Sequence, residues 1–320
     1  MRRAMLRSAI PAALLMLSAI FAAAGSNDAP FGVALGLFGT VIPLIRAWRT
    51  TKGSALRPAL VWAAIALGLA MLSQVLALSE IEETGRPVAG QVVYLSTLAA
   101  FATTISVLNA RTPGGGAWSI LMALLVVVFL VPWLEAGGLA REANGWDRLR
   151  LSAPWTIFYG LIVLAGVTNY LPTRYGQAAF VLGLGFFAEY LGLTRLDWSR
   201  SLRGCLWSVV PALFGITVYV ADYLSVRNTS SPPGLERLWS TFRDSWGVVW
   251  GLRVLERFNR AAETSGWPIR LTWQGVLRNP PEAPIPPEAE AVLAGLLRRF
   301  ASPEWRGRAA TANDPGSIGP

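Results

Sequence analysis

The sequence contains no histidine, one cysteine and one lysine, and these shortages exclude several kinds of site. Without histidine the chain cannot form a Ser-His-Asp or Cys-His catalytic centre, an imidazole metal site or a haem site with a histidine ligand. A single cysteine, Cys205, excludes an intrachain disulfide and any Cys-rich zinc or iron–sulfur site. We interpret Cys205 as a small apolar residue at a helix end. The sequence therefore predicts no cofactor and no metal.

Charged residues are also scarce. They make up 15% of the 320 residues, whereas hydrophobic residues make up 53%; a soluble domain carries about 25% charged residues. The net charge of +9 lies largely beside apolar stretches, where basic residues orient a membrane protein and attract anionic lipid. No DNA- or RNA-binding motif accompanies it. The composition thus predicts a partner in the lipid bilayer and none in nucleic acid.

The stretch 117–133, AWSILMALLVVVFLVPW, is uncharged and has a tryptophan near each end, Trp118 and Trp133. A helix that is apolar on every side leaves no face for water. At about 1.5 Å per residue it nearly crosses a hydrocarbon layer about 30 Å thick. Seven other stretches are similar, so we expect an all-α polytopic membrane protein with eight transmembrane helices. Their expected ranges are 8–24, 31–48, 59–78, 91–110, 117–133, 153–171, 175–193 and 204–224.

Two features leave the span count open between seven and eight. Residues 1–24 fit either a signal peptide or an uncleaved first span, and we favour the span because another apolar stretch follows at once. The loop after the second span is basic and is predicted to be cytoplasmic, which places both termini in the cytoplasm of a bacterial inner-membrane protein. The loop 194–203 then lies outside although it carries net positive charge. Either the early helices dominate orientation, or one span is wrong.

Two acidic residues fall within predicted spans, Glu189 and Asp222. A charge inside a membrane is costly, so such a residue is a functional candidate by default. Both lie near helix ends, where packing or interfacial exposure is the competing explanation. In the second span, Gly32 and Gly36 form a G-x-x-x-G motif that indicates close helix packing, and Pro43 predicts a bend.

Residues 225–306 differ in character and are expected to form a small, mostly helical cytoplasmic region, followed by a disordered tail at 307–320. Apolar residues recur at spacings of three and four from 238 to 250, with arginines nearby. This pattern fits a helix in the membrane interface and equally a helix packed in a small soluble domain. The residues expected to contact membrane or partner are Trp239, Trp246, Trp250, Arg253 and Arg257. Residues 267–276 can form a short strand, 280–287 a Pro-rich linker and 289–300 a helix.

Three functions remain under consideration at this point. The favoured one is a non-catalytic scaffold or assembly component that presents its C-terminal region to a protein partner. The alternative is a transporter or channel for a small solute, ion or lipid, which Glu189 motivates. An enzyme is less favoured, because its only compact polar cluster, Glu80, Glu82, Glu83 and Arg86, is more readily explained as solvated loop charge. The oligomeric state is not determined by these patterns.

Overall fold

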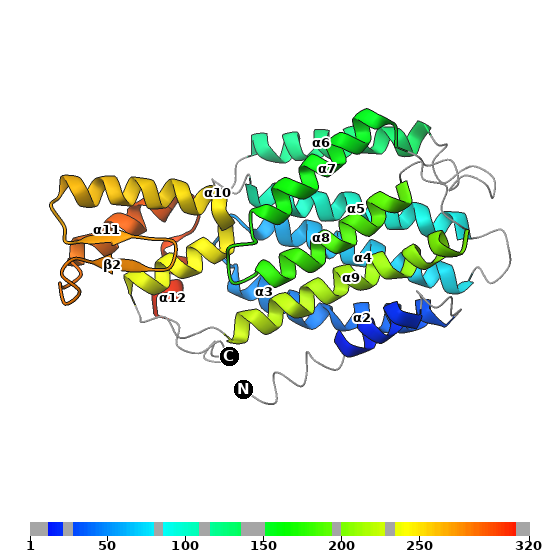
Figure 1. Ribbon diagram of the computed structural model, residues 1–320, viewed down its shortest axis with the longest axis horizontal. Coiled ribbons are helices and arrows are strands. Elements are labelled where there is room, and N and C mark those ends of the chain that lie inside the picture. Colours follow the sequence, from blue (N-terminus) through cyan, green and yellow to red (C-terminus); the bar gives the residue numbers. More distant parts are fainter. Residues whose placement is uncertain are drawn as a thin grey trace.

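The computed structural model describes residues 12–21, 28–79, 86–108, 116–135, 151–193, 200–227 and 234–311. Within these ranges the chain is helical apart from one short hairpin. Long helices run side by side in a bundle, and residues 234–311, here called the C-terminal unit, lie at one end of it (Figure 1). The all-α class expected from the sequence is confirmed.

The helices of the bundle follow the expected apolar stretches. Their bounds are Ala12–Phe21 for a short first helix, then α2 (Ala29–Gly39), α3 (Val41–Thr50), α4 (Arg57–Ser79), α5 (Arg86–Leu108), α6 (Gly116–Glu135), α7 (Ala153–Thr168), α8 (Gly176–Leu193) and α9 (Arg200–Arg227). The predicted bend of the second span is a break between α2 and α3 at Thr40. It lies one turn before Pro43, whose ring nitrogen cannot bond the Gly39 carbonyl.

Within the described ranges, five helices are long and apolar enough to cross a membrane: Ala29–Thr50 (α2 with α3), Arg57–Leu78, Val88–Leu108, Gly176–Leu193 and Leu206–Val226. The chain is thus a multi-pass membrane protein by its helix composition. Two other apolar helices are shorter, Ala12–Phe21 and α7. A helix of ten residues rises about 15 Å, half of a hydrocarbon layer. The count of eight spans stays a prediction, as do the expected domain limits at 224 and 306.

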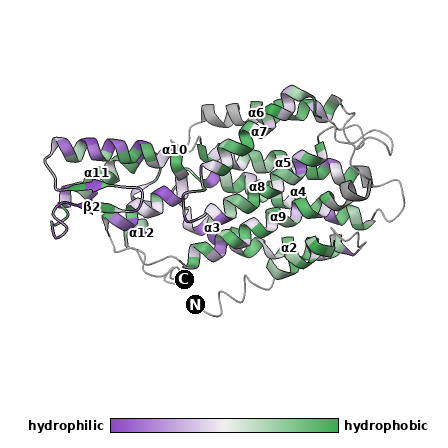
Figure 2. Cartoon of the chain, viewed as in Figure 1, coloured by the Kyte–Doolittle hydropathy of each residue, from purple (hydrophilic) through white to green (hydrophobic). Residues whose placement is uncertain are grey.

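Hydrophobic residues make up most of the helices of the bundle (Figure 2). Large apolar residues with more than half of their surface exposed include Phe31, Ile42, Ile157, Leu161 and Phe180. In water this exposed surface would be unfavourable, because burying apolar surface stabilises a protein by about 25 cal/mol per Å². The exposed apolar faces therefore indicate contact with lipid.

Helix α5 lies at the centre of the bundle. Of its apolar window 78% is buried, against 28% to 44% for the other four candidate spans. Its Phe101 ring packs 4.6 Å from Tyr159 of α7 and 4.7 Å from Phe186 of α8. Hydroxyl groups of α5 bond main-chain carbonyls: Ser96 donates to Ala66 of α4 at 2.8 Å, and Thr97 donates to Val93 of its own helix.

The glycine motif of α2 also packs as expected. A Cβ atom at Gly32 would lie 2.1 Å from the Ser18 hydroxyl, and one at Gly36 would lie 2.5 Å from Leu15, both in the helix Ala12–Phe21. The Gly36 carbonyl accepts a hydrogen bond from Tyr219 of α9. The missing side chains thus allow the first helix and α9 to reach the α2 backbone.

The C-terminal unit contains α10 (Leu235–Thr264), β1 (Ile269–Leu271), β2 (Val276–Arg278), α11 (Pro287–Leu296), a 3₁₀ turn η3 (Leu297–Arg299) and α12 (Pro303–Thr311). The two strands pair antiparallel, with Arg270 opposite Leu277. Asn259 of α10 bonds both the N–H and the carbonyl of Leu271, which fixes the hairpin against the helix. The expected extended segment at 267–276 is thus one strand and the turn of a hairpin.

The core of this unit is aromatic. Trp246 packs 5.0 Å from Phe242, 5.2 Å from Trp305 and 5.9 Å from Phe300, measured between ring centroids. The same apolar cluster includes Ala55, Leu56, Ala59 and Val107 of the bundle. Because one core contains residues of both parts, the C-terminal unit is packed onto the bundle.

We expect Lys52 and Thr264 to lie on one side of the membrane and Ser152 on the other. The turn at Lys52 contacts the C-terminal unit, whereas Leu151 bonds Leu193 at the far end of α8. Single cysteines at the three exposed positions, in a Cys205→Ala background, are to be labelled in intact cells with a membrane-impermeant maleimide. Labelling of Lys52→Cys and Thr264→Cys from opposite sides would contradict this arrangement.

Candidate functional site

The polar site with the most hydrogen bonds between separate segments is the contact of the C-terminal unit with three helix ends of the bundle, here called the docking interface. The bundle contributes residues 51–57, Leu108 and residues 169–175. These residues lie at the C-terminal ends of α3, α5 and α7, so three separate helix ends meet the same unit. Figure 1 shows this junction between the bundle and the yellow and orange segments.

Asn169 forms the centre of the docking interface. Helix α10 is kinked at Gly247, where φ is 74° and ψ is −165°. After such a break the next N–H groups have no acceptor one turn earlier. The Asn169 carbonyl accepts from Val248 N–H at 2.9 Å, and its side-chain oxygen accepts from Val249 N–H at 3.0 Å. Its amide nitrogen donates to the Trp246 carbonyl. Asn169 therefore caps the second half of α10 from another segment of the chain.

The residues beside Asn169 extend this contact along α10. The Tyr170 hydroxyl donates to the Ser245 carbonyl at 2.9 Å. The Trp273 indole N–H, from the hairpin turn, donates to the Pro172 carbonyl at 2.8 Å. The turn between α7 and α8 is thus held on both sides, and α7 ends at Thr168 because the next residues bond the C-terminal unit. This explains why α7 is shorter than the expected span 153–171.

A second part of the interface is a backbone contact with the turn after α3. Ala55 N–H donates to the Phe300 carbonyl at 2.9 Å, and Ser302 N–H donates to the Gly53 carbonyl at 2.7 Å. Ser54 and Ala301 form an isolated β-bridge. A third part is the Trp250 indole N–H, which donates to the Leu108 carbonyl at the end of α5. Because main-chain groups are paired at all these points, the unit has one defined position.

Two arginine side chains of the interface contact the same acidic side chain, Asp244. Asp244 accepts two hydrogen bonds from Arg243, at 3.0 and 2.9 Å, and lies 3.5 Å from Nε of Arg174. Arg174 also donates to the Tyr175 hydroxyl at 2.8 Å. Two guanidinium groups therefore face one carboxylate that is almost fully buried.

The structure places the three predicted tryptophans inside the C-terminal unit. Trp239 and Trp246 are fully buried and Trp250 is nearly so. Two of their indole N–H groups bond main-chain carbonyls: Trp239 donates to Thr272, and Trp250 to Leu108. A helix packed in a small domain, one of the two expected alternatives, is therefore what the described residues form. The apolar stripe is buried because the hairpin, α11 and α12 cover it.

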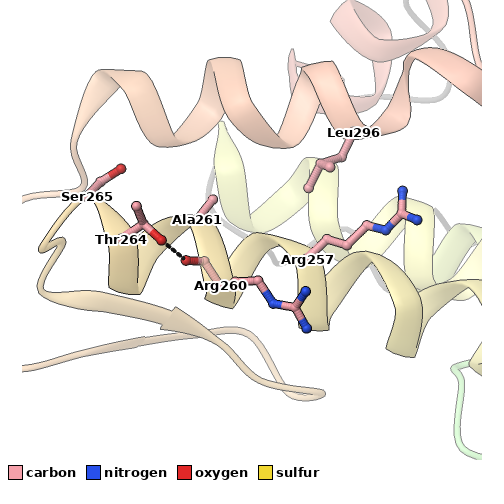
Figure 3. A pocket seen from close by; sticks show the side chains of 6 residues that line it. All are labelled: Arg257, Arg260, Ala261, Thr264, Ser265 and Leu296. Carbon is pink, nitrogen blue, oxygen red and sulfur yellow. Dashed lines mark hydrogen bonds between the residues drawn. The ribbon is translucent and has the colours of Figure 1, made fainter.

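The two predicted arginines are exposed on the same helix. Arg253 stacks over the Trp250 ring at 4.9 Å, and Arg257 lies one turn further along α10. Arg257 and Arg260 line a shallow recess of about 410 Å³ against Leu296 of α11 (Figure 3). Arg260 pairs with Glu256 across one turn, but both are exposed, so this pair contributes little stability. A role for Arg253 and Arg257 in contacting a partner or the membrane stays a prediction.

The two acidic candidates lie far from each other. Asp222 is near the docking end of α9 and forms an ion pair of 2.8 Å with Arg46 of α3. Glu189 is near the opposite end of α8, about 20 Å along the helix from its start. Glu189 is buried and its Oε1 has no hydrogen-bond partner. Tyr94 and Tyr159 lie within electrostatic range of it, but their hydroxyls donate to the Phe129 and Phe186 carbonyls.

Several expectations fall outside the described residues. Glu80, Glu82 and Glu83 do so, as does the loop 194–199, and the side chains of Arg86 and Cys205 are likewise not described. In the part of the chain that the structure describes, no group of three or more Cys, Asp or Glu could hold a metal ion. Comparison with protein-family models, with curated proteins and with solved structures finds no match.

Sequence reasoning did not identify Asn169, Tyr170 and Arg174 as interface residues. One available signal was the very short connection between two apolar stretches at 172–174, which forces a tight turn at a helical-bundle end. A second signal was Gly247, since a glycine within an apolar stripe marks a break or a close approach. Neither signal indicates that the two sites meet, because 77 residues separate Asn169 from Trp246.

Replacing Gly247 with alanine should loosen the C-terminal unit. The backbone at this position is in a region essentially restricted to glycine, and a Cβ atom would lie 2.3 Å from the Asn169 amide nitrogen. We expect a loss of about 1–3 kcal/mol of stability and faster proteolysis after residue 227. Thermal unfolding and limited proteolysis of the purified protein in detergent measure both effects.

Gly295→Ala in α11 is the matched control, because a Cβ atom there meets nothing within 4 Å. Alanine favours helix over glycine by about 1 kcal/mol, so this variant should be as stable as the wild type or more so. Equal behaviour of the two variants would contradict the role assigned to the kink.

Proposed function

We propose that this protein is a non-catalytic membrane scaffold whose C-terminal unit is held in a fixed position for a protein partner. The observation that carries this proposal is the docking interface itself. Main-chain hydrogen bonds from two turns of the bundle, the Trp250 bond to the end of α5 and a shared apolar core support a single orientation of the unit. A fixed orientation presents the same exposed surface in every copy of the molecule.

The distribution of basic residues supports a cytoplasmic position for the C-terminal unit. The exposed Arg49 and Lys52 lie at the bundle end that contacts it. Basic residues beside spans remain preferentially in the cytoplasm. We infer eight spans, both termini in the cytoplasm and a bacterial inner membrane as the location. In this orientation the loop 194–203 is external, and its positive charge is overridden by the early helices.

The surface most suited to a partner is the exposed face of α10. Arg253, Arg257 and Arg260 follow one another at spacings of four and three, which places them on one side of the helix. Leu252, on the same half of the helix, has half of its surface exposed. Arginine beside exposed apolar surface is a common composition for a protein interface.

The scaffold proposal predicts a stoichiometric partner that depends on this face. The full chain, tagged and expressed at its native level, is to be purified from native membranes in mild detergent. We expect the partner to be lost from the double variant Arg253→Glu, Arg257→Glu, because reversed charges repel what the arginines attract. Purification of the wild type alone, without any stoichiometric companion, would argue against a scaffold.

Arg270→Glu is the control for the single reversals Arg253→Glu and Arg257→Glu, because each of the three changes the net charge by the same amount. Arg270 is exposed on the hairpin and pairs with Glu263, so its loss costs little stability. The partner should stay bound to Arg270→Glu. Equal loss from all reversed variants would attribute binding to overall charge and not to the α10 face.

One observation favours transport as a second candidate function. Glu189 is a buried acid within a candidate span, and its Oε1 lacks a hydrogen-bond partner. Buried intramembrane acids are typical of ion and proton pathways. The surroundings of Glu189 weaken this reading, since the nearby Tyr94 and Tyr159 hydroxyls donate to main-chain carbonyls instead.

Replacing Glu189 with glutamine distinguishes the two functions. In a scaffold the amide removes an unsatisfied buried acid, so the midpoint of thermal unfolding should stay equal or rise. Proteoliposomes should show no solute or ion flux with either form. The exposed Glu256→Gln serves as the control. Transport would be established, and the scaffold proposal overturned, by a flux that the wild type and Glu256→Gln both show and Glu189→Gln lacks.

A further inference from the structure

A groove of about 560 Å³ lies at the docking end of the bundle, between the start of α8 and the end of α9. Polar residues of the α7–α8 turn and the first turn of α8 line one part of it: Thr173, Arg174 and Gln177. Apolar residues line the remainder: Phe180 and Val181 one turn further along α8, and Leu224 of α9. The groove therefore changes from polar to apolar along the helix direction.

The polar part carries positive charge that the acidic groups of the described residues do not balance. Arg174 shares Asp244 with Arg243, so two guanidinium groups face one carboxylate. The other nearby acid, Asp222, is paired with Arg46 at 2.8 Å. The Arg174 guanidinium donates one hydrogen bond, from Nη2 to Tyr175, and its buried Nε lies 3.5 Å from the Asp244 carboxylate. Its Nη1 donates to no group of the described residues. Arg174 thus retains N–H donors for an anion.

The groove faces the surroundings of the apolar bundle. Phe180 has 58% of its surface exposed, and Leu171, also at the rim, has 45%. Both helices that form the groove, Gly176–Leu193 and Leu206–Val226, are candidate membrane spans. A ligand here has its polar group level with the turn and its apolar part along helices that face lipid. A soluble phosphate would leave the apolar half empty.

We propose that this groove binds one anionic phospholipid. Its phosphate contacts Arg174 and the exposed Gln177 amide, and an acyl chain lies along Phe180, Val181 and Leu224. The Thr173 hydroxyl does not take part as a donor, since it already donates to the Tyr170 carbonyl at 2.7 Å. The lipid phosphate balances the charge of the extra guanidinium group. This inference assumes that the bundle lies in a membrane, but it does not depend on the proposed scaffold function.

Native mass spectrometry of the full chain tests the lipid site. The protein, stripped of lipid in a neutral detergent, is to be titrated with dioleoylphosphatidylglycerol or with dioleoylphosphatidylcholine. We expect one phosphatidylglycerol to bind in preference to phosphatidylcholine. Gln177→Glu should weaken phosphatidylglycerol binding about fivefold, because one charge near a lipid surface has roughly this effect. Gln177→Lys should bind as tightly as the wild type or more so.

The variants are chosen to preserve the fold. Gln177 is exposed in the first turn of α8, where an acidic residue is favourable to a helix. Gln274→Glu makes the same change at an exposed position of the hairpin turn and should not alter lipid binding. Equal binding of the two lipids, or equal effects of Gln177→Glu and Gln274→Glu, would overturn the site. Displacement of phosphatidylglycerol by an equal concentration of glycerol 3-phosphate would show a phosphate site without lipid.

Discussion

The position of the C-terminal unit depends on the hydrogen bonds that Asn169 forms with main-chain groups of the kinked helix α10. Gly247 interrupts the helix and leaves N–H groups without acceptors, and Asn169 accepts from two of them and donates to the Trp246 carbonyl. A buried main-chain group without a partner costs about as much as a lost hydrogen bond. The kink at Gly247 and the turn at 169–175 therefore stabilise each other through these hydrogen bonds. This contact couples the turn to the orientation of the whole C-terminal unit.

The two cores of the molecule differ because they are adapted to different solvents. In the bundle, α5 and its aromatic neighbours are buried while large apolar residues such as Phe31 and Phe180 remain outside. In the C-terminal unit the aromatic residues turn inward, whereas Arg253, Arg257 and Arg260 of α10 remain outside. Lipid accepts an apolar surface and water does not, so the change in surface character marks the end of the membrane region.

Much of the fold was accessible from the sequence. Long uncharged stretches predicted the helices of the bundle, Gly32 and Gly36 predicted a close contact, and Pro43 predicted an interruption near its position. The stripe from Trp239 to Trp250 predicted a helix but not its environment, since the same periodicity suits a membrane surface and a protein core. The burial of Trp239 and Trp246 became clear only with the hairpin and α12 in place. Those elements carry weak local signals because they are short.

By itself the sequence determined the membrane class, the helical content and the chemistries that an absence of histidine and a single cysteine forbid. These properties follow from composition and from periodicity along neighbouring residues. Only the tertiary structure decided which polar groups meet: Asn169 with Trp246, Arg46 with Asp222, and Arg174 with Asp244. Their separations in the chain are 70 residues or more. Such pairs depend on how the helices pack, and no pattern among adjacent residues specifies that packing.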